Sequence, residues 1–297
     1  MSFKMKKLLA LVCFVLVLPH GALAKKKFVS PEFAAQIADL ERKEGGRIGV
    51  AALNTENGQR LEYRADERFA MCSTFKLLLV AAVLARVDVD VEELDRYIRY
   101  SAIDMLDHSP ITKNNFRKRR MTVGDLSAAA IQYTDNTAAN LLLNSIDGPK
   151  GFTNYMRALG DKVTRLDRNE TTLNTNIEGD ERDTTTPSAM VDSMYKVLIG
   201  DSLSPKSREL LINMLLGSTT GGSKLRAGIN PEWKVGDKTG AGENGASNDV
   251  AIVFPPNQKP FLVAVYYTGS DNSTDQKNEV IAEIGRIVST TFYSNKK

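Results

Sequence analysis

Histidine and cysteine are the scarcest chemistry-bearing residues of this sequence. Its 297 residues include two cysteines, Cys13 and Cys72, and two histidines, His20 and His108. A zinc site built from histidine and cysteine needs three or four ligands. Cys13 and His20 also fall in a segment that we expect to be cleaved off, so the mature chain has too few such residues for a disulfide or a zinc site. We therefore expect no metal and no other cofactor.

The one remaining histidine also restricts the serine chemistry that is open to the protein. A Ser-His-Asp triad would have to use His108, which lies in a polar stretch with Asp107, Ser109 and Pro110. A histidine in such a loop is more often a solvated surface residue than a catalyst. If the protein is a serine hydrolase, we expect a base other than histidine.

Most of the chain carries no net charge, because its basic and acidic residues balance. The formal charge is +3, from 39 basic and 36 acidic residues, and three unbalanced lysines lie within residues 1–24. That segment has an apolar run, Leu8–Leu18, and ends in Ala22-Leu23-Ala24, the pattern of a secretory signal peptide. The run is too short to span a bilayer comfortably. We predict cleavage after Ala24, a neutral protein that is periplasmic or secreted, and no membrane contact after signal removal.

Strand-like runs occur near both ends of the chain. Two follow a first predicted helix, at 48–53 and 60–63, and three precede the last predicted helix, at 233–238, 248–254 and 261–268. Hydrophobic residues make up 42% of the chain, which is ample for a packed core. The pattern predicts an α/β fold of the α+β type, in which one five-stranded antiparallel sheet is built from both ends and flanked by the terminal helices.

The middle of the chain has mostly helical periodicity. We predict that residues 25–64 and 216–297 form a discontinuous α/β lobe and that residues 65–215 form an inserted all-helical lobe. Within the second lobe, residues 163–186 form a long polar loop without periodicity, and such loops are usually functional. The active site is expected between the two lobes.

A serine and a lysine open the most apolar helix of this middle region. Ser73-Thr74-Phe75-Lys76 begins a run that stays apolar to Leu84. At this spacing the Ser73 hydroxyl and the Lys76 amine share one helix face. Desolvation lowers the pKa of a lysine, which can then take a proton from serine. The same spacing recurs by chance at Ser193 and Lys196, but only Lys76 lies in a run where a charge needs a specific reason.

Two further motifs follow in order along the chain. Tyr133-Thr134-Asp135-Asn136 comes after a predicted helix, and Lys238-Thr239-Gly240 lies on a predicted strand. S-x-x-K, a Ser-Asp-Asn-like triplet and K-T-G, in this order, resemble the class A serine β-lactamases. The literal triplet Ser270-Asp271-Asn272 comes too late and is interpreted as a turn. Longer strings extend the resemblance over essentially all of the mature chain: 71–76, 137–143, 165–168, 180–185 and 219–221.

The resemblance implies a two-step acyl transfer. Ser73 would attack a lactam carbonyl, and Thr134 would deliver a proton to the departing nitrogen. Glu170 would activate the water that cleaves the acyl-enzyme, and Asn174 would help to position this water. Either Lys76 or Glu170 would be the base for acylation.

The resemblance also implies how a small-molecule β-lactam is held. Asn136 would bind the amide side chain of the substrate, and Lys238 and Thr239 would hold its carboxylate. The backbone N–H groups of Ser73 and Ala241 would form the oxyanion hole. Such an enzyme would confer β-lactam resistance.

Several positions depart from the family pattern. Thr134 stands where serine is usual, and Thr171 follows Glu170 where many relatives have proline and often a cis peptide bond. The strand after K-T-G lacks a common arginine, and Lys224 is a candidate for the compensating charge or a solvated loop residue. His108 lies where many relatives have an aromatic at the rim of the site, and it is either a substrate contact or a surface residue.

Two other functions share part of this motif set. A penicillin-binding D,D-peptidase or transpeptidase has the Ser-Lys and K-T-G elements but no counterpart of Glu170. A non-turnover β-lactam sensor becomes acylated and stays so, but it is normally tethered to a membrane partner. We expect a monomer.

We also expect no binding of nucleic acid. The mature chain is neutral, and the basic run Arg117–Arg120 has no interleaved aromatic residues and fits a solvated turn.

Overall fold

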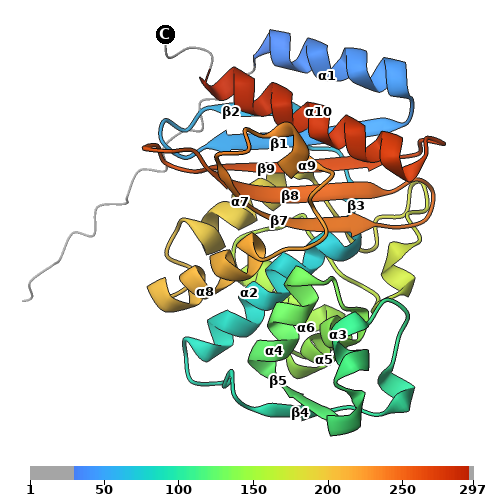
Figure 1. Cartoon of the computed structure of the whole chain (residues 1–297), viewed down its shortest axis with the longest axis vertical. Helices are drawn as coiled ribbons and strands as arrows, with labels where there is room; N and C mark the ends of the chain where they lie inside the picture. The colour runs from blue at the N-terminus through green and yellow to red at the C-terminus, as the bar shows by residue number, and fades with distance from the viewer. Residues whose placement is uncertain (1–29, 294–297) are drawn as a thin grey trace, which may run out of the picture.

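A five-stranded antiparallel sheet forms one layer of the computed structural model, which describes residues 30–293 (Figure 1). The predicted signal peptide at 1–24 lies outside the described residues. The strand order is β2-β1-β9-β8-β7, so strands from the two ends of the chain meet at the β1–β9 pair. This confirms the predicted sheet. Its strands are β1 (Arg47–Asn54), β2 (Arg60–Tyr63), β7 (Lys234–Ala241), β8 (Ser247–Phe254) and β9 (Phe261–Thr268).

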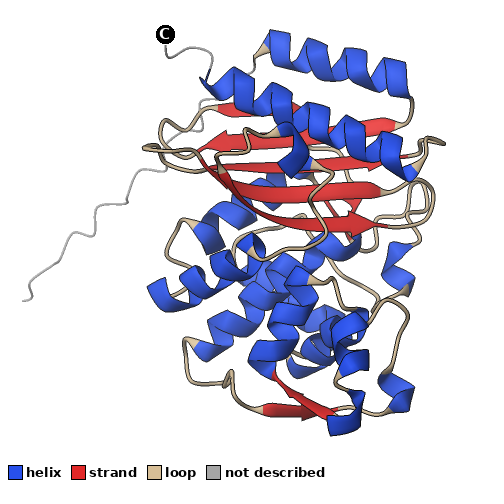
Figure 2. Cartoon of the chain, in the orientation of Figure 1, coloured by secondary structure: helices blue, strands red, loops and turns tan. Residues whose placement is uncertain are grey.

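The two terminal helices cover the outer face of this sheet (Figure 2). They are α1 (Pro31–Glu44) and α10 (Thr274–Tyr293), and short α9 (Leu225–Gly228) packs beside α10. Ser30 caps α1 by accepting a hydrogen bond from the Phe33 amide at 3.3 Å. Buried side chains such as Phe33 and Ile284 then pack onto the sheet. Both helices therefore follow from caps and apolar stripes that the sequence contains.

The Ser270-Asp271-Asn272 triplet has a structural role in this layer. The Ser270 hydroxyl and the Asn272 amide donate hydrogen bonds to the Glu44 carbonyl at 3.3 and 3.0 Å. These contacts tie the segment before α10 to the end of α1. The triplet therefore has a structural role, and none of these hydrogen bonds is with Ser73.

Helices fill the region between the sheet-forming ends. The first of them, α2 (Phe75–Val87), is buried from Phe75 to Leu84 and packs against α4, α5 and α8. A wholly apolar helix suits such a central position. The helices that follow are α3 (Pro110–Asn114), α4 (Val123–Gln132), α5 (Asn136–Ser145), α6 (Gly148–Ala158), α7 (Pro187–Leu198) and α8 (Pro205–Leu216). The 3-10 turns are η1 (Cys72–Thr74), η2 (Ala102–Asp104), η3 (Phe116–Lys118) and η4 (Thr172–Asn174).

The region 65–215 is not entirely helical, which corrects the expected all-helical lobe. It contains two two-stranded sheets, β3 (Phe69–Ala70) with β6 (Thr184–Thr185) and β4 (Tyr97–Arg99) with β5 (Arg120–Thr122). Strands of two or three residues are too short to carry a recognisable period-two pattern. The predicted lobe boundaries themselves stay a prediction.

The inner face of the sheet rests directly on this middle region. At Gly49 in β1, a Cβ atom would lie 2.4 Å from the Phe69 ring and 3.0 Å from Pro187, the first residue of α7. Only glycine allows the strand to approach so closely. The sheet is therefore buried on both faces, and its β7 edge faces the start of α2.

Replacement of Ile284 by alanine tests the outer layer. The side chain is fully buried between α10 and the sheet, so its removal leaves a cavity. We expect the free energy of unfolding to fall by about 2–5 kcal/mol, as measured by urea denaturation. Glu279→Ala, at an exposed position of the same helix, is the control and should change it by less than about 0.5 kcal/mol. Equal losses in the two variants would contradict the assigned packing.

Candidate active site

Ser73 lies in the η1 turn, at the entrance of α2 and against the β7 edge of the sheet. A Cβ atom at Gly240 would lie 3.2 Å from the Ser73 amide nitrogen, so the strand and the turn are in direct contact. The Asn248 amide donates to the carbonyls of Ala70 and Met71 at 2.9 and 3.1 Å, which fixes the chain just before the turn. The serine is thus held between a helix start and a sheet edge.

Cys72 shares the η1 turn with Ser73 and is fully buried. Burial raises the pKa of its thiol to about 12, and the charge of Glu170 adds to this effect. The thiol therefore stays protonated, which agrees with an inert packing role.

Lys76 is completely buried one helical turn after the serine. Its Nζ lies 2.9 Å from Ser73 Oγ and donates to the Thr134 carbonyl at 2.8 Å and to Asn136 Oδ1 at 2.7 Å. It also lies 2.9 Å from Glu170 Oε1, in an ion pair with no exposed side-chain surface on either partner. Burial lowers the pKa of Lys76, and Glu170 opposes that effect.

Glu170 reaches the same point from the long loop. Ser73 Oγ donates to Glu170 Oε1 at 3.3 Å, and Asn174 donates to Oε2 at 2.6 Å. Asn140 on α5 holds the backbone of Glu170 through two reciprocal bonds of 2.9 Å. The peptide bond between Glu170 and Thr171 is cis. The carboxylate is therefore fixed from both its backbone and its side chain.

Thr134 lies on the opposite side of the serine, in the turn between α4 and α5. Its φ of +52° falls in the left-handed region, which is rare for a β-branched residue. Its hydroxyl accepts hydrogen bonds from Lys238 at 2.9 Å and from Lys76 at 3.4 Å. One hydroxyl thus bridges two lysine side chains.

Lys238 approaches this hydroxyl from β7. Besides Thr134, its Nζ contacts the Thr239 carbonyl at 2.8 Å. Burial lowers the pKa of Lys238 to about 7, and repulsion from Lys76 adds to the effect. The Thr239 hydroxyl shares a hydrogen bond of 2.7 Å with Thr220. The end of β7 therefore combines an ammonium group with two hydroxyls.

Lys224 directly precedes α9 and lies beside the first residue of β8, and only 8% of its surface is exposed. Its Nζ donates to the Ser247 hydroxyl, and Ser247 is paired across the strands with Ala241. Burial lowers the pKa of Lys224, while the buried Asp249 opposes this effect. The carboxylate of Asp249 accepts the Leu225 amide at 3.1 Å, so it holds the chain beside Lys224. Lys224 is therefore buried, which contradicts the prediction of a solvated loop charge; its role as the compensating charge stays a prediction.

His108 is exposed and lies next to Asn136, at the turn between α4 and α5. Its Nε2 lies 3.2 Å from the Tyr133 carbonyl, and its own carbonyl accepts the Asn136 amide at 3.1 Å. The side-chain amide of Asn136 donates to the Asp107 carbonyl at 2.9 Å. These bonds place His108 beside the Thr134–Asn136 turn, and its substrate contact stays a prediction.

The long loop is closed by a buried ion pair. Arg168 Nε lies 2.5 Å from the Asp183 carboxylate, which also accepts the Asp167 and Arg168 amides at 2.7 and 2.9 Å. Arg165 instead pairs with Asp167 on its own side of the loop at 2.6 Å. Arg168 alone of these two arginines pairs across the loop, and it also lies 3.9 Å from Asp180.

Three contributors were not found from the sequence: Asn140, Asn248 and Thr220. Asn140 and Thr220 lie in strings typical of the resemblance, but all three residues act through an amide or hydroxyl whose partner is distant along the chain.

Within residues 30–293, no group of three His, Cys, Asp or Glu side chains could hold a metal ion. The same residues include no helix that is long and apolar enough to cross a membrane.

The geometry defines the chemistry that this cluster can perform. Ser73 Oγ has a lysine nitrogen at 2.9 Å and a carboxylate oxygen at 3.3 Å, either of which can accept its proton. On the far side, the Thr134 hydroxyl can pass a proton to a leaving group. Such a constellation defines a serine acyl-transfer enzyme that works without histidine.

Comparison with known proteins identifies the family. Residues 32–292 match the β-lactamase enzyme family. The chain is 44% identical to β-lactamase OXY-2 of Klebsiella oxytoca, over 85% of this chain and 87% of that protein. It is 42% identical to β-lactamase Toho-1 of Escherichia coli, over 86% of this chain and 88% of that protein. A solved structure of the class A β-lactamase of the last common ancestor of Gram-negative bacteria superposes with a TM-score of 0.87 at 53% sequence identity. The match covers 88% of this chain and 99% of that chain. The chain belongs to the β-lactamase family, as a class A serine β-lactamase.

Asp183→Ala tests the closure of the loop. The substitution leaves Arg168 without its buried partner and removes the acceptor of two amides. We expect a loss of about 3–5 kcal/mol in the free energy of unfolding and faster hydrogen exchange at the amides of Asp167 and Arg168. Glu181→Ala is the control, since this exposed side chain lies 3.8 Å from Arg68 and should contribute less than about 1 kcal/mol. Unchanged exchange in Asp183→Ala would contradict the clamp.

Proposed function

We propose that this chain hydrolyses β-lactam antibiotics through a serine acyl-enzyme and thereby confers resistance to them. The observation that carries the proposal is the position of Glu170, whose carboxylate lies 3.3 Å from Ser73 Oγ and 2.9 Å from Lys76 Nζ. A carboxylate at this point can activate a water against an ester formed on Ser73. The relatives that match most of the chain carry the name β-lactamase.

In the acylation step, Ser73 Oγ forms a bond to the lactam carbonyl carbon and the bond from that carbon to the ring nitrogen breaks. Lys76 or Glu170 takes the serine proton, since both lie within reach. Thr134 donates a proton to the departing nitrogen. Its contacts with both lysines support this relay. The Ser73 and Ala241 amides stabilise the developing oxyanion, and the contact between η1 and β7 supports this pairing.

Substrate binding uses the charged end of β7. Lys238 and Thr239 hold the substrate carboxylate, and Lys224 adds a second positive charge beside the start of β8. Asn136 binds the amide side chain, with His108 at the rim. Ammonium and hydroxyl donors that converge on one point suit a carboxylate.

In the deacylation step, Glu170 removes a proton from a water that attacks the ester carbonyl. Asn174, which lies 2.6 Å from Glu170 Oε2, orients this water. The ester bond to Ser73 breaks and the serine regains its proton. This step separates the proposal from both alternatives, because a D,D-peptidase has no counterpart of Glu170 and a β-lactam sensor stays acylated.

We further propose that the protein acts as a monomer in the periplasm or outside the cell. The supporting observation is the secretory pattern of residues 1–24, together with the balanced charge of the remaining sequence. Small β-lactams are then the partners of the catalytic site, which needs neither nucleic acid nor a membrane.

Glu170→Ala tests the two-step mechanism. We expect the variant to be acylated by penicillin at Ser73 and to stay acylated, because the water has lost its base. Turnover should fall by about 10²–10⁴-fold, the usual contribution of a positioned base. Intact-protein mass spectrometry and steady-state hydrolysis measure the two effects.

Thr172→Ala is a matched control in the same loop, because the Thr172 hydroxyl contacts only a backbone carbonyl, that of Asn169, at 3.1 Å. It should keep wild-type turnover. A single stoichiometric burst from the wild type would instead support a sensor or peptidase.

The pH dependence of kcat/KM tests the role of Lys238. Its pKa of about 7 means that the ammonium is charged below that pH and neutral above it. We therefore expect kcat/KM for penicillin to be full below pH 7 and to decline by about tenfold per pH unit above it, since kcat/KM reports the free enzyme. Lys238→Arg keeps its charge and should lose this alkaline decline. A decline that persists in Lys238→Arg would assign it to another group.

A further inference from the structure

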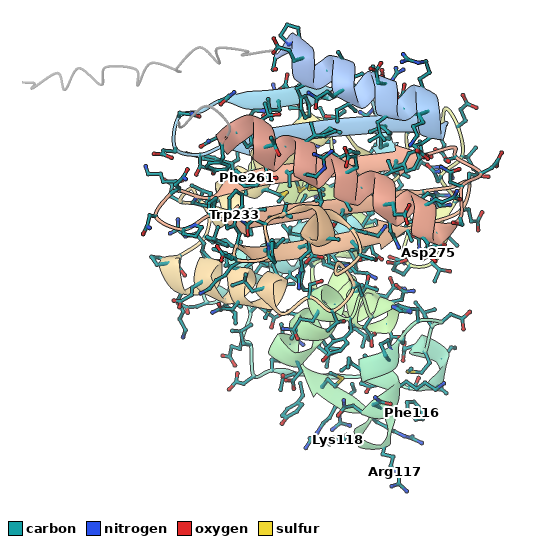
Figure 3. The ribbon with its side chains drawn as sticks, turned by 45° about the horizontal axis from the view of Figure 1, so that its top comes forward. Phe116, Arg117, Lys118, Trp233, Phe261 and Asp275 are labelled. Atoms are coloured by element: carbon teal, nitrogen blue, oxygen red, sulfur yellow. The ribbon has the colours of Figure 1, made fainter. Side chains whose placement is uncertain are left out.

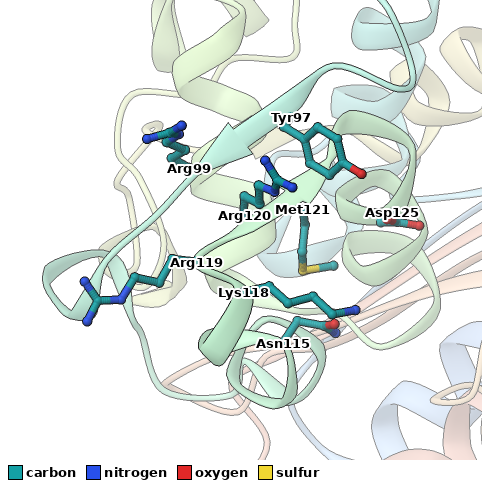
Figure 4. A pocket seen from close by; sticks show the side chains of 8 residues that line it. All are labelled: Tyr97, Arg99, Asn115, Lys118, Arg119, Arg120, Met121 and Asp125. Atoms are coloured by element: carbon teal, nitrogen blue, oxygen red, sulfur yellow. The ribbon is translucent and has the colours of Figure 1, made fainter.

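The tip of the helical region carries a basic pocket that lies apart from the catalytic site. Its volume is about 560 Å³, and it is lined by residues of β4, β5, the turn 115–119 and the first turn of α4 (Figure 4). We call it the tip pocket. Figure 1 places β4 and β5 at the end of the molecule opposite the five-stranded sheet, and Figure 3 shows Arg117 and Lys118 at the same end.

Positive charge dominates the tip pocket. Four lining residues are cationic, Arg99, Lys118, Arg119 and Arg120, and one, Asp125, is acidic. Within residues 30–293, no ion pair of 4.0 Å or less joins any of the four cations to a carboxylate. The pocket therefore has a surplus of unneutralised donors.

Two exposed arginines elsewhere in the described chain each pair with a nearby carboxylate. Arg42 pairs with Asp39 at 2.8 Å although 75% of its side chain is exposed. Arg286 likewise pairs with Glu283, with 61% of its side chain exposed. Exposure alone thus does not explain why the arginines of the tip pocket are unpaired.

The register of β4 and β5 brings two of these cations together, which destabilises the strand pair. Arg99 lies directly opposite Arg120 in the β4–β5 pair, and like charges in that position destabilise a sheet. Arg119 adopts a φ of +50°, which is uncommon for a residue other than glycine. The Arg120 guanidinium lies 4.5 Å from the centre of the Tyr97 ring, which orients the cation but leaves its charge in place. A bound anion would relieve the repulsion.

The shape and lining of the pocket indicate which anion fits. In Figure 4, Lys118 and Arg120 extend toward the same side as Tyr97 and Met121, whereas Arg119 extends away. A lysine and an arginine on one cavity suit the several acceptor oxygens of a phosphate group. Tyr97 and Met121 add apolar surface for an organic part, and the volume is that of a small-molecule site. We propose that the tip pocket binds a phosphate-bearing ligand, either a soluble phosphate compound or the headgroup of an anionic lipid.

The test compares two double variants that lose the same charge. Lys118→Gln with Arg120→Gln alters the two cations that converge in the tip pocket, and Arg42→Gln with Arg286→Gln removes two exposed arginines elsewhere. Isothermal titration with inorganic pyrophosphate probes the soluble source. Sedimentation with phosphatidylcholine vesicles that contain phosphatidylglycerol probes the lipid source, and pure phosphatidylcholine vesicles are the blank. Urea denaturation and penicillin hydrolysis verify that each variant is folded and active.

We expect the wild type to bind pyrophosphate or the anionic vesicles, and whichever it binds identifies the source. The tip variant should lose this binding by about tenfold or more, the effect of removing charged hydrogen bonds, while the control changes by less than about twofold. Hydrolysis should be unchanged in both. No binding to either probe, or equal loss in the two variants, would overturn the proposal. Binding of single-stranded DNA without binding of either probe would also overturn it, in favour of a nucleic-acid surface.

Discussion

The rest of the site depends on the burial of one ammonium group, that of Lys76. A buried charge costs several kcal/mol unless it is paired and hydrogen-bonded. Here the compensating atoms come from separate parts of the chain: the Thr134 carbonyl, Asn136 Oδ1, the Glu170 carboxylate and Ser73 Oγ. The start of α2, the α4–α5 turn and the long loop must therefore meet at one point. The same group that constrains the fold keeps the nucleophile within reach of a base.

A second buried cation extends this constraint to the sheet. Lys238 reaches Thr134 from β7, and the Thr134 hydroxyl is shared by both lysines. Repulsion between the lysines is one cause of the lowered pKa of Lys238. Two buried cations this close together favour a carboxylate beside them, which supports the proposed role of Lys238 in substrate binding.

The sequence predicted the parts of the site that depend on local spacing. Ser73 and Lys76 are one helical turn apart at the start of an apolar run, and the structure places Lys76 Nζ 2.9 Å from Ser73 Oγ. Asn140 and Asn248 could not be found this way, because their partners lie 30 and more than 170 residues away and an amide side chain has no period. The short β4–β5 pair escaped for a related reason, since three residues are too few to show alternation. Long-range polar contacts therefore become visible only in the folded structure.

Two segments join the two cationic regions, and they determine how the regions can influence each other: α4, and the chain from β4 to α3, whose Ile111 amide donates to Asp135 at 3.0 Å. Asp125 lies in the first turn of α4 at the tip pocket, and Thr134 follows the end of the same helix at the catalytic site. A helix of 10 residues spans about 15 Å, and charges are largely screened beyond about 8 Å at physiological ionic strength. Direct electrostatic coupling is therefore weak, and any coupling must pass through movement of α4 or of the segment before it, which is hydrogen-bonded to Asp135 and Asn136. The buried residues of α4 pack against α2, and this packing opposes movement of the helix.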